Sequence, residues 1–293
     1  MLGRLWVLGL GVALVLAGLA PVEASTLVAP HVVSIAGYDG DAAEPFLSRD
    51  GHWLFFNNGY ASGTNTDLFS AERLDDLHFV FRGPVTGANS TSIDAVASAD
   101  ARGELFFVSD RSYASTQSTV YRGRLSKSGA GVSDVALVPG LEASGPARVI
   151  FDAEVSPDGN WLLFAEGQYV PYDPLAVPVT ADLQLARRSA GGFVRDPSSK
   201  AVFANVNSPA LEYAPALSPD GLTLAFTRLQ AGPAIDPQIF VATRPDLRSP
   251  FGTPTRVATA TGFVEGAAFS PDGRAVYFHH KVGDRYRIER LQL

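Results

Sequence analysis

Five carboxylates at recurring places are the side chains of this chain with the clearest chemical potential. Each stands shortly before a short repeated turn: Glu44, Asp94, Asp152, Glu212 and Glu265. A sixth, Glu154, comes two residues after Asp152. Carboxylates that a fold brings together repel one another, raise each other's pKa or hold a cation. Three interpretations are open: hydrogen bonds to loop amides around a wet channel, ligation of a central metal, or an acid–base pair.

Other catalytic patterns are missing from the sequence. It has no Gly-x-Ser-x-Gly elbow and no His-Glu-x-x-His motif, so an α/β-hydrolase-type serine and a zincin site are unsupported. It has no cysteine, which excludes disulfides and thiolate metal sites. His279 and His280 end one predicted strand, so alternation can aim only one of them, taken as His279, at a site. Arg111, Arg228 and Lys281 stand at similar strand ends, where they either receive an anionic ligand or pair with neighbouring acids.

The repeated turn indicates the elements that position these residues. It reads Ser-Pro-Asp-Gly at 156–159, 218–221 and 270–273, and Ser48-Arg49-Asp50-Gly51 departs from it only at the proline. We align a degenerate fifth copy on Ser98, Asp100 and Gly103, with one extra residue before its apolar run. Proline, aspartate and glycine suit successive positions of a type I turn, so these aspartates are predicted to be structural.

Each turn joins two short apolar strands, and further strands follow it. The third strands are predicted at 67–73, 119–125, 182–188, 238–244 and 286–293. A fourth is predicted at 78–85 and, less clearly, at 134–140, 200–206 and 255–260. Four strands per unit, with a period of roughly 50–60 residues, predict an all-β fold, a five-bladed β-propeller.

The ends of the chain predict how the propeller closes. The last unit stops after its third strand, and the segment 27–37 is a strand without a blade. We expect this segment to supply the missing outer strand, because pairing the first and last segments removes two open edges. The blades are predicted at 43–90, 91–145, 146–208, 209–262, and 263–293 with 27–37, all within one domain, 25–293.

The repeats resemble the WD40-like propeller repeats of the TolB type, whose hallmark is Ser-Pro-Asp-Gly between the first two strands of a blade. The stretch "EPFLSRDGHWLFFNN" followed by "DLFSAER" is also similar to repeats of Gram-negative envelope proteins. The resemblance covers the chain from about residue 43 to its end and implies a propeller fold. TolB itself differs, because it has an N-terminal α/β domain and six blades.

Propeller geometry predicts that the variable loops gather on the face opposite the repeated turns. They are 57–66, 110–119, 166–181, 228–237 and 279–284. Propellers and other scaffolds usually bind through such loops. The ligand-binding residues predicted on this face are Glu44, Asn57, Tyr60, Asp94, Arg111, Tyr113, Asp152, Glu166, Tyr169, Glu212, Arg228, Glu265 and His279.

A catalytic alternative uses the same channel mouth. Five-bladed glycosidases carry acid and base on successive innermost strands, and by analogy the pair would be Asp94 with Asp152 or Glu154. We expect no cofactor, with calcium as the open alternative because all the donors are oxygens.

The first residues predict export. Arg4 precedes an uncharged run over 5–19, and Val22-Glu23-Ala24 is a small-x-small pattern, so 1–24 reads as a signal peptide cleaved before Ser25. A retained membrane anchor is the alternative. The absence of cysteine excludes a lipoprotein. We therefore expect a periplasmic or secreted monomer without a membrane span after cleavage.

Charge limits the partners. A formal net charge of -7 over 293 residues argues against nucleic acid, because no basic stripe could offset phosphate repulsion. The leading hypothesis is a non-catalytic binding or scaffold module for a protein or cell-envelope ligand. The alternative is a carbohydrate-active hydrolase or lyase that uses the carboxylates of the channel mouth.

Overall fold

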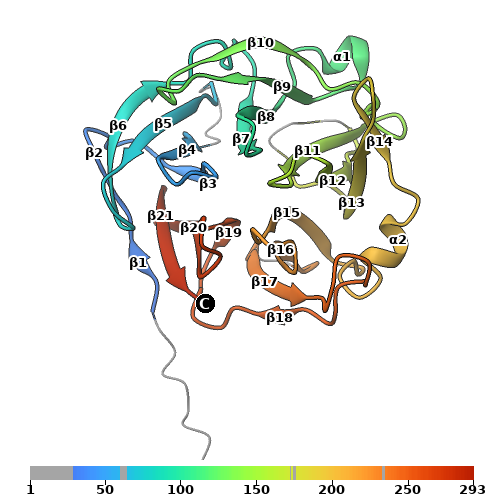
Figure 1. Cartoon of the computed structure of the whole chain (residues 1–293). Coiled ribbons are helices and arrows are strands. Elements are labelled where there is room, and N and C mark those ends of the chain that lie inside the picture. Colours follow the sequence, from blue (N-terminus) through green and yellow to red (C-terminus); the bar gives the residue numbers. More distant parts are fainter. Residues whose placement is uncertain (1–28, 60–64, 172, 174–175, 233–234) are drawn as a thin grey trace, which may run out of the picture.

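The computed structural model describes residues 29–59, 65–171, 173, 176–232 and 235–293. These residues form five β-sheets around a central axis (Figure 1). In every sheet one strand lies nearest the axis, and the chain then runs outward through antiparallel neighbours. The chain is an all-β, five-bladed β-propeller, as the repeated turn predicted. The proposed signal peptide, 1–24, lies outside the described residues.

The blades follow chain order. Blade 1 contains β2 (Ser34–Ala36), β3 (Ala43–Leu47), β4 (Trp53–Asn57), β5 (Leu68–Arg73) and β6 (His78–Pro84). Blade 2 contains β7 (Asp94–Ala99), β8 (Glu104–Ser109), β9 (Val120–Leu125) and β10 (Val132–Leu137). Blade 3 contains β11 (Arg148–Val155), β12 (Trp161–Gln168), β13 (Thr180–Arg188) and β14 (Phe193–Arg195).

Blade 4 contains β15 (Leu211–Leu217), β16 (Thr223–Leu229), β17 (Gln238–Thr243) and β18 (Thr255–Arg256). Blade 5 contains β19 (Val264–Phe269), β20 (Ala275–Val282), β21 (Arg285–Gln292) and, from the other end of the chain, β1 (His31–Val32). Short helices α1 (Tyr113–Thr116) and α2 (Ser199–Val202) lie in the connections. No helix among the described residues is long and apolar enough to cross a membrane.

The predicted closure by the N-terminal segment is confirmed. β1 pairs antiparallel with β21, where His31 lies opposite Arg290 and Val32 opposite Glu289. A few residues later, β2 pairs in parallel with β6, which the sequence had not predicted. The N-terminal segment therefore joins the last blade to the first on their outer strands (Figure 1).

The hydrophobic core of the described residues consists of five clusters, and each lies between two neighbouring blades. This explains why the second strands are apolar on both faces, since each face packs against a different blade. The closing interface between blades 5 and 1 is built in the same way, with Val33, Phe79, Tyr277 and Ile288 in one cluster.

The repeated turns are structural, as predicted. In blade 3, Ser156 Oγ donates to Asp158 at 2.6 Å and accepts the N–H of Trp161 at 3.0 Å. The same contacts recur in the turns of blades 1, 4 and 5. Glycine closes each turn with a positive φ, which is 70° at Gly159.

Two details of the predicted repeat are wrong. In blade 2, Asp100 and not Ser98 takes the position of the turn serine, since its N–H bonds Glu104 O and its Oδ1 accepts the N–H of Arg102 and Glu104. That turn is one residue shorter than the others, not longer.

In blade 3, the predicted strand 200–206 is instead occupied by α2, and the fourth strand is β14. Asp196 accepts the N–H of Ser198 at 2.8 Å, which favours a helical turn after Pro197.

Candidate functional site

Each innermost strand contains an irregularity near the variable-loop face, and this irregularity determines which side chains line the mouth of the channel. Each of β3, β7, β11, β15 and β19 shifts register through a β-bulge. A bulge bends the strand and re-aims its side chains. As a result two successive residues, such as Phe151 and Asp152, both line the same cavity at the mouth of the channel.

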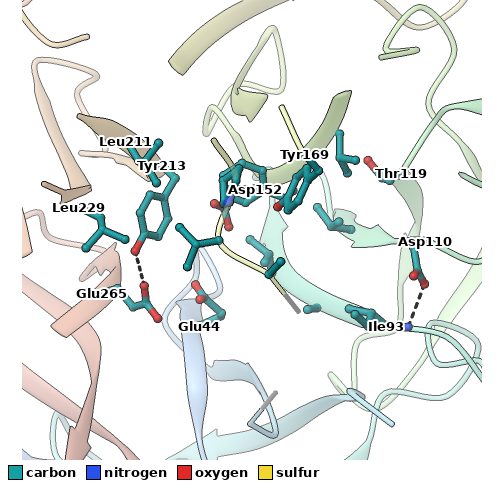
Figure 2. A pocket seen from close by; sticks show the side chains of 18 of the residues that line it. Glu44, Ile93, Asp110, Thr119, Asp152, Tyr169, Leu211, Tyr213, Leu229 and Glu265 are labelled. Carbon is teal, nitrogen blue, oxygen red and sulfur yellow. Dashed lines mark hydrogen bonds between the residues drawn. The ribbon is translucent and has the colours of Figure 1, made fainter. Parts of the chain in front are cut away.

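This cavity, of about 240 Å³, is lined mainly by apolar side chains, with Asp110 and Thr119 among them and a group of three acids at its floor. Its walls include Ile93, Val108, Val149, Phe151, Leu211 and Leu229. Val177, in the loop between β12 and β13, and Ile235, between β16 and β17, complete it from the variable loops. The carboxylates of Glu44, Asp152 and Glu265 lie together among these walls (Figure 2).

Glu265 is held by two donors. The hydroxyl of Tyr213 donates to its Oε2 at 2.5 Å, and His279 Nε2 lies 3.1 Å from its Oε1 (Figure 2 draws the first contact). His279 is fully buried, and its Nδ1 accepts the backbone N–H of Glu44 at 3.1 Å. The ring proton is therefore on Nε2, and His279 donates to Glu265 as a neutral imidazole.

Burial and mutual repulsion favour the protonated forms of the other two acids, Glu44 and Asp152, and so raise their pKa values. Burial, together with the charges of Asp152 and Glu265, raises the pKa of Glu44 well above its usual value. Burial is also the main reason that the pKa of Asp152 rises to about 7; Glu265 adds to the effect, and the N–H of Ala214 opposes it. The pKa of Tyr213 is also raised well above 10, chiefly by burial.

Two of the five predicted acids, Asp94 and Glu212, do not line this cavity. Asp94 is fully buried, accepts the N–H and hydroxyl of Ser90, and pairs with Arg111. Glu212 repeats the pattern in blade 4, with the N–H and hydroxyl of Ser208 and with Arg228 Nε at 2.7 Å.

Glu166 forms a related anchor in blade 3. It accepts the N–H and hydroxyl of Ser144 at 2.8 and 2.7 Å, and it pairs with Arg195 at 2.7 Å. In all three blades a buried acid and an arginine tie down the loop that enters the blade. Of the two roles that the sequence left open for Arg111 and Arg228, binding an anionic ligand or pairing with a neighbouring acid, the structure therefore shows the second.

Glu154 lies further along the channel, toward the repeated turns. It pairs with Arg49, whose Nη2 is 2.8 Å from Glu154 Oε1. A second, small cavity of about 30 Å³ lies between this pair and the acid floor, and both Glu44 and Glu154 line it. The structure therefore does not bring Asp94 or Glu154 into contact with the cavity at the mouth, whereas Asp152 lines it.

The remaining predicted residues have varied places. Asn57 is buried and donates to Asn58 O at 2.9 Å. Tyr113, in α1, donates to Arg148 O at 2.8 Å. Tyr169 lines the cavity edge-on to Phe151, with ring centroids 6.3 Å apart. Tyr60 lies outside the described residues.

A metal would find mainly oxygen donors here. Among the described residues, one cluster brings metal-ligand atoms within 4.8 Å of one another: Glu44, Glu265 and His279. Both nitrogens of His279 are already engaged in hydrogen bonds. The members of the cluster that remain available to a hard cation are therefore Glu44 and Glu265, and Asp152 is not part of it.

Sequence reasoning missed Tyr213 and the apolar walls. Glu212 was chosen for its acidity, but its neighbour Tyr213 lines the cavity. A usable signal was the distance to the turn. The acids that line the cavity stand four or five residues before the first residue of the turn: Glu44 before Ser48, Asp152 before Ser156 and Glu265 before Ser270. Asp94 and Glu212 stand six residues before Asp100 and Ser218.

Comparison with known proteins supports the fold. No family model matches the sequence, and no curated protein matches it. The structure of BT0996 in an RGII complex superposes with a TM-score of 0.58 at 11% identity, covering 90% of this protein and 90% of BT0996. A thermostable family-43 glycoside hydrolase gives a TM-score of 0.54 at 12% identity, covering 90% of this protein and 93% of the hydrolase.

TolB from Acinetobacter baumannii is also among the similar structures. It matches with a TM-score of 0.47 at 14% identity, over 86% of this protein. The matched region spans 55% of the length of that TolB. At 11–12% identity, the likeness to BT0996 and to the family-43 hydrolase shows a shared fold alone, and the chemistry has to be argued from the residues of the cavity.

Proposed function

We propose that this chain is an exported, non-catalytic binding module that holds part of a protein or cell-envelope ligand in the cavity of its variable-loop face. One observation carries the proposal: loops and inner strands of several blades converge on a single concave, mainly apolar cavity with a polar floor. Sites of this composition are typical of ligand binding, where apolar walls supply affinity and a few polar groups fix orientation.

The size of the cavity indicates the scale of the ligand group. About 240 Å³ is smaller than most drug-sized sites and suits one protruding side chain or a small molecule. Arg49 and Glu154 pair further along the channel, so a ligand would enter from the variable-loop face.

A wall substitution tests the proposal. Leu211 lines the cavity, and Leu211→Trp should fill it, whereas Leu74→Trp changes a residue between β5 and β6 that is 66% exposed. A chemically diverse fragment panel is screened by thermal shift against wild type and both variants. Binders of the cavity should stabilise wild type and Leu74→Trp and lose their effect on Leu211→Trp. If every stabilising fragment acts equally on Leu211→Trp, the cavity is not the binding site.

The carbohydrate-active enzyme is the second candidate, and one observation favours it. Asp152, with a pKa raised to about 7 beside Glu265 and Glu44, retains a proton near neutral pH, as a general acid must. Asp152→Asn should then abolish turnover of a polysaccharide without lowering the melting temperature. Turnover that survives in Asp152→Asn, or no turnover across a broad polysaccharide panel, would contradict this candidate.

A further inference from the structure

We propose that the cavity at the channel mouth selects an organic cation, a protonated amine carried on an apolar body. This inference rests on the proposed function and names the chemistry of its ligand. It follows from acids at the floor that have no arginine or lysine partner, from one carboxylate without a hydrogen-bond partner, and from the apolar walls above them.

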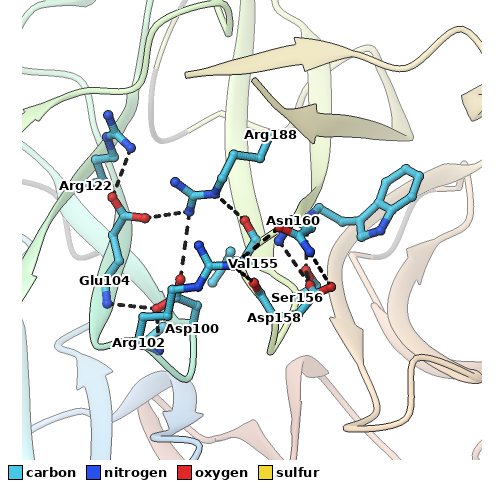
Figure 3. Close-up of polar contacts among 12 residues, drawn as sticks. Asp100, Arg102, Glu104, Arg122, Val155, Ser156, Asp158, Asn160 and Arg188 are labelled. Atoms are coloured by element: carbon cyan, nitrogen blue, oxygen red, sulfur yellow. Dashed lines mark hydrogen bonds and ion pairs between the residues drawn. The ribbon is translucent and has the colours of Figure 1, made fainter. Parts of the chain in front are cut away.

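The floor lacks the arginines that accompany buried acids elsewhere in the structure. The buried acids that form an ion pair with an arginine are Asp94, Asp100, Glu154, Glu166, Asp196, Glu212 and Glu289. Figure 3 shows one of these pairs, in which Arg188 lies between Asp100 and Glu104. Asp152 is the one buried acid of the described residues without such a partner.

Glu44 and Glu265 have no arginine or lysine partner either among the described residues. The one side chain there that could pair with them as a cation is His279, which the hydrogen-bond pattern makes neutral. Three carboxyl groups therefore share the floor without a fixed positive charge, and burial and mutual repulsion keep Glu44 and Asp152 protonated up to neutral pH or above. Because a buried carboxylate without a partner is costly, a cation supplied from outside is the partner that would let these groups ionise.

The carboxylate of Glu44 is the second, independent sign of a ligand. Its side chain is 10% exposed and lines the cavity, yet no hydrogen-bond donor of the described residues reaches it. The nearest ionisable atom, His279 Nδ1 at 3.9 Å, already accepts the backbone N–H of Glu44. Gly266 makes room for this carboxylate, because a Cβ there would lie 2.5 Å from Glu44 Oε2.

The walls favour an organic cation over a hydrated metal ion. Above the floor stand Ile93, Val108, Val149, Leu211 and Leu229, which offer nothing to the waters of a hydrated ion. An ammonium group at the floor can donate to the carboxylates while its apolar body contacts these side chains. The rings of Phe151, Tyr213 and Phe263 also line the cavity and add faces suited to a cation.

Calorimetric titration with matched probes tests the inference. The probes are 2-phenylethylamine and hexylamine as cations, 2-phenylethanol as the neutral counterpart and 3-phenylpropanoate as the anion, with calcium chloride alone in a separate arm. The amines should bind wild type at about pH 8. They should bind more tightly than the alcohol, and the anion should not bind.

Variants tie this binding to the floor. Glu44→Gln and Asp152→Asn should weaken amine binding about tenfold or more, because each removes a charged acceptor. Glu72→Gln, a partly exposed acid on β5, is the matched control and should bind as wild type does. Thermal melts of each variant verify folding.

The outcomes separate this inference from the proposed function. If the alcohol or the anion binds as tightly as the amines, and Leu211→Trp abolishes that binding, the cavity is a binding site but the cation inference is overturned. Calcium binding that Glu44→Gln abolishes, without amine binding, also overturns it. If no probe or fragment binds in a way that depends on Leu211, both proposals fail.

Discussion

Arg49 of blade 1 donates to Glu154 of blade 3, with Nη2 and Oε1 2.8 Å apart. The same guanidinium donates to Ala99 O of blade 2 at 2.9 Å and to Val155 O of blade 3 at 2.7 Å. One side chain therefore joins the innermost strands of three blades near the repeated turns. Arg49 stands where the other full copies of the turn have proline, so the departure from the repeat has a structural reason.

Replacing Arg49 by the repeat's own residue tests this contact. Arg49→Pro should keep the turn, as in 156–159, but leave Glu154 buried without a charge partner. We expect unfolding in urea to show a loss of about 3 kcal/mol, since breaking a buried ion pair on one side is costly. The double variant with Glu154→Ala should recover most of this loss. Additive losses for the two changes would show that the pair contributes no coupling.

The pKa of Asp152 predicts a pH dependence of stability. The native carboxyl keeps its proton up to about pH 7, whereas the unfolded chain loses it near the ordinary value of 3.8. Between these values the native state binds more protons, so the free energy of unfolding falls as pH rises, by up to about 1.4 kcal/mol per pH unit.

Urea unfolding measures this slope. Wild type should lose more stability than Asp152→Asn between about pH 5 and about pH 8. The remaining titratable groups are common to both proteins, so the difference reports on Asp152. Parallel profiles for the two proteins would contradict a raised pKa at this residue.

The anchor of Asp94 and Arg111 should matter for stability and not for ligand binding. Asp94→Asn leaves Arg111 without its buried charge partner, and we expect a loss of about 3 kcal/mol in the free energy of unfolding. Affinity for a cavity ligand should not change, because neither residue lines the cavity. Weaker binding at unchanged stability would instead give Asp94 a direct role in the site.

Closure by the N-terminal segment predicts the effect of disrupting it. Val33 is buried between blades 5 and 1, so Val33→Asp places a charge in the closing cluster without a partner. This variant, and removal of residues 25–37, should aggregate, which size-exclusion chromatography measures. His31→Ala, at an exposed position of the same segment, is the control. A monomeric, fully folded truncated protein would contradict the closure.

Much of the fold could be predicted because a propeller repeats one local signal. The third strands expected at 119–125 and 238–244 match β9 and β17 to within one residue at each end. Prediction failed where local sequence ran against the pattern. At 200–206 the apolar residues resemble a strand, but Asp196 and Pro197 begin a helical turn, and the chain meets the next blade through α2.

The candidate site was predictable only as a region. The channel mouth, Asp152 and Glu265 were expected there, yet Asp94 and Glu212 are similar in type and in sequence context and bind arginines instead. Simple strand alternation cannot separate these cases, because a β-bulge in every inner strand changes which residues face the axis.

The sequence by itself determined the architecture. A turn that recurs at near-even spacing, with each copy flanked by apolar strands, indicates repeated blades. An N-terminal strand without a blade of its own, together with a last unit one strand short, indicates that the two ends of the chain pair to close the propeller. Only the tertiary structure decided the chemistry. Whether a carboxylate is neutralised depends on partners distant in the chain, as Glu154 is paired by Arg49 while Glu44, Asp152 and Glu265 share a floor without arginine or lysine. Local sequence carries no record of those distances, so the acids without a cationic partner can be identified only once the blades are assembled.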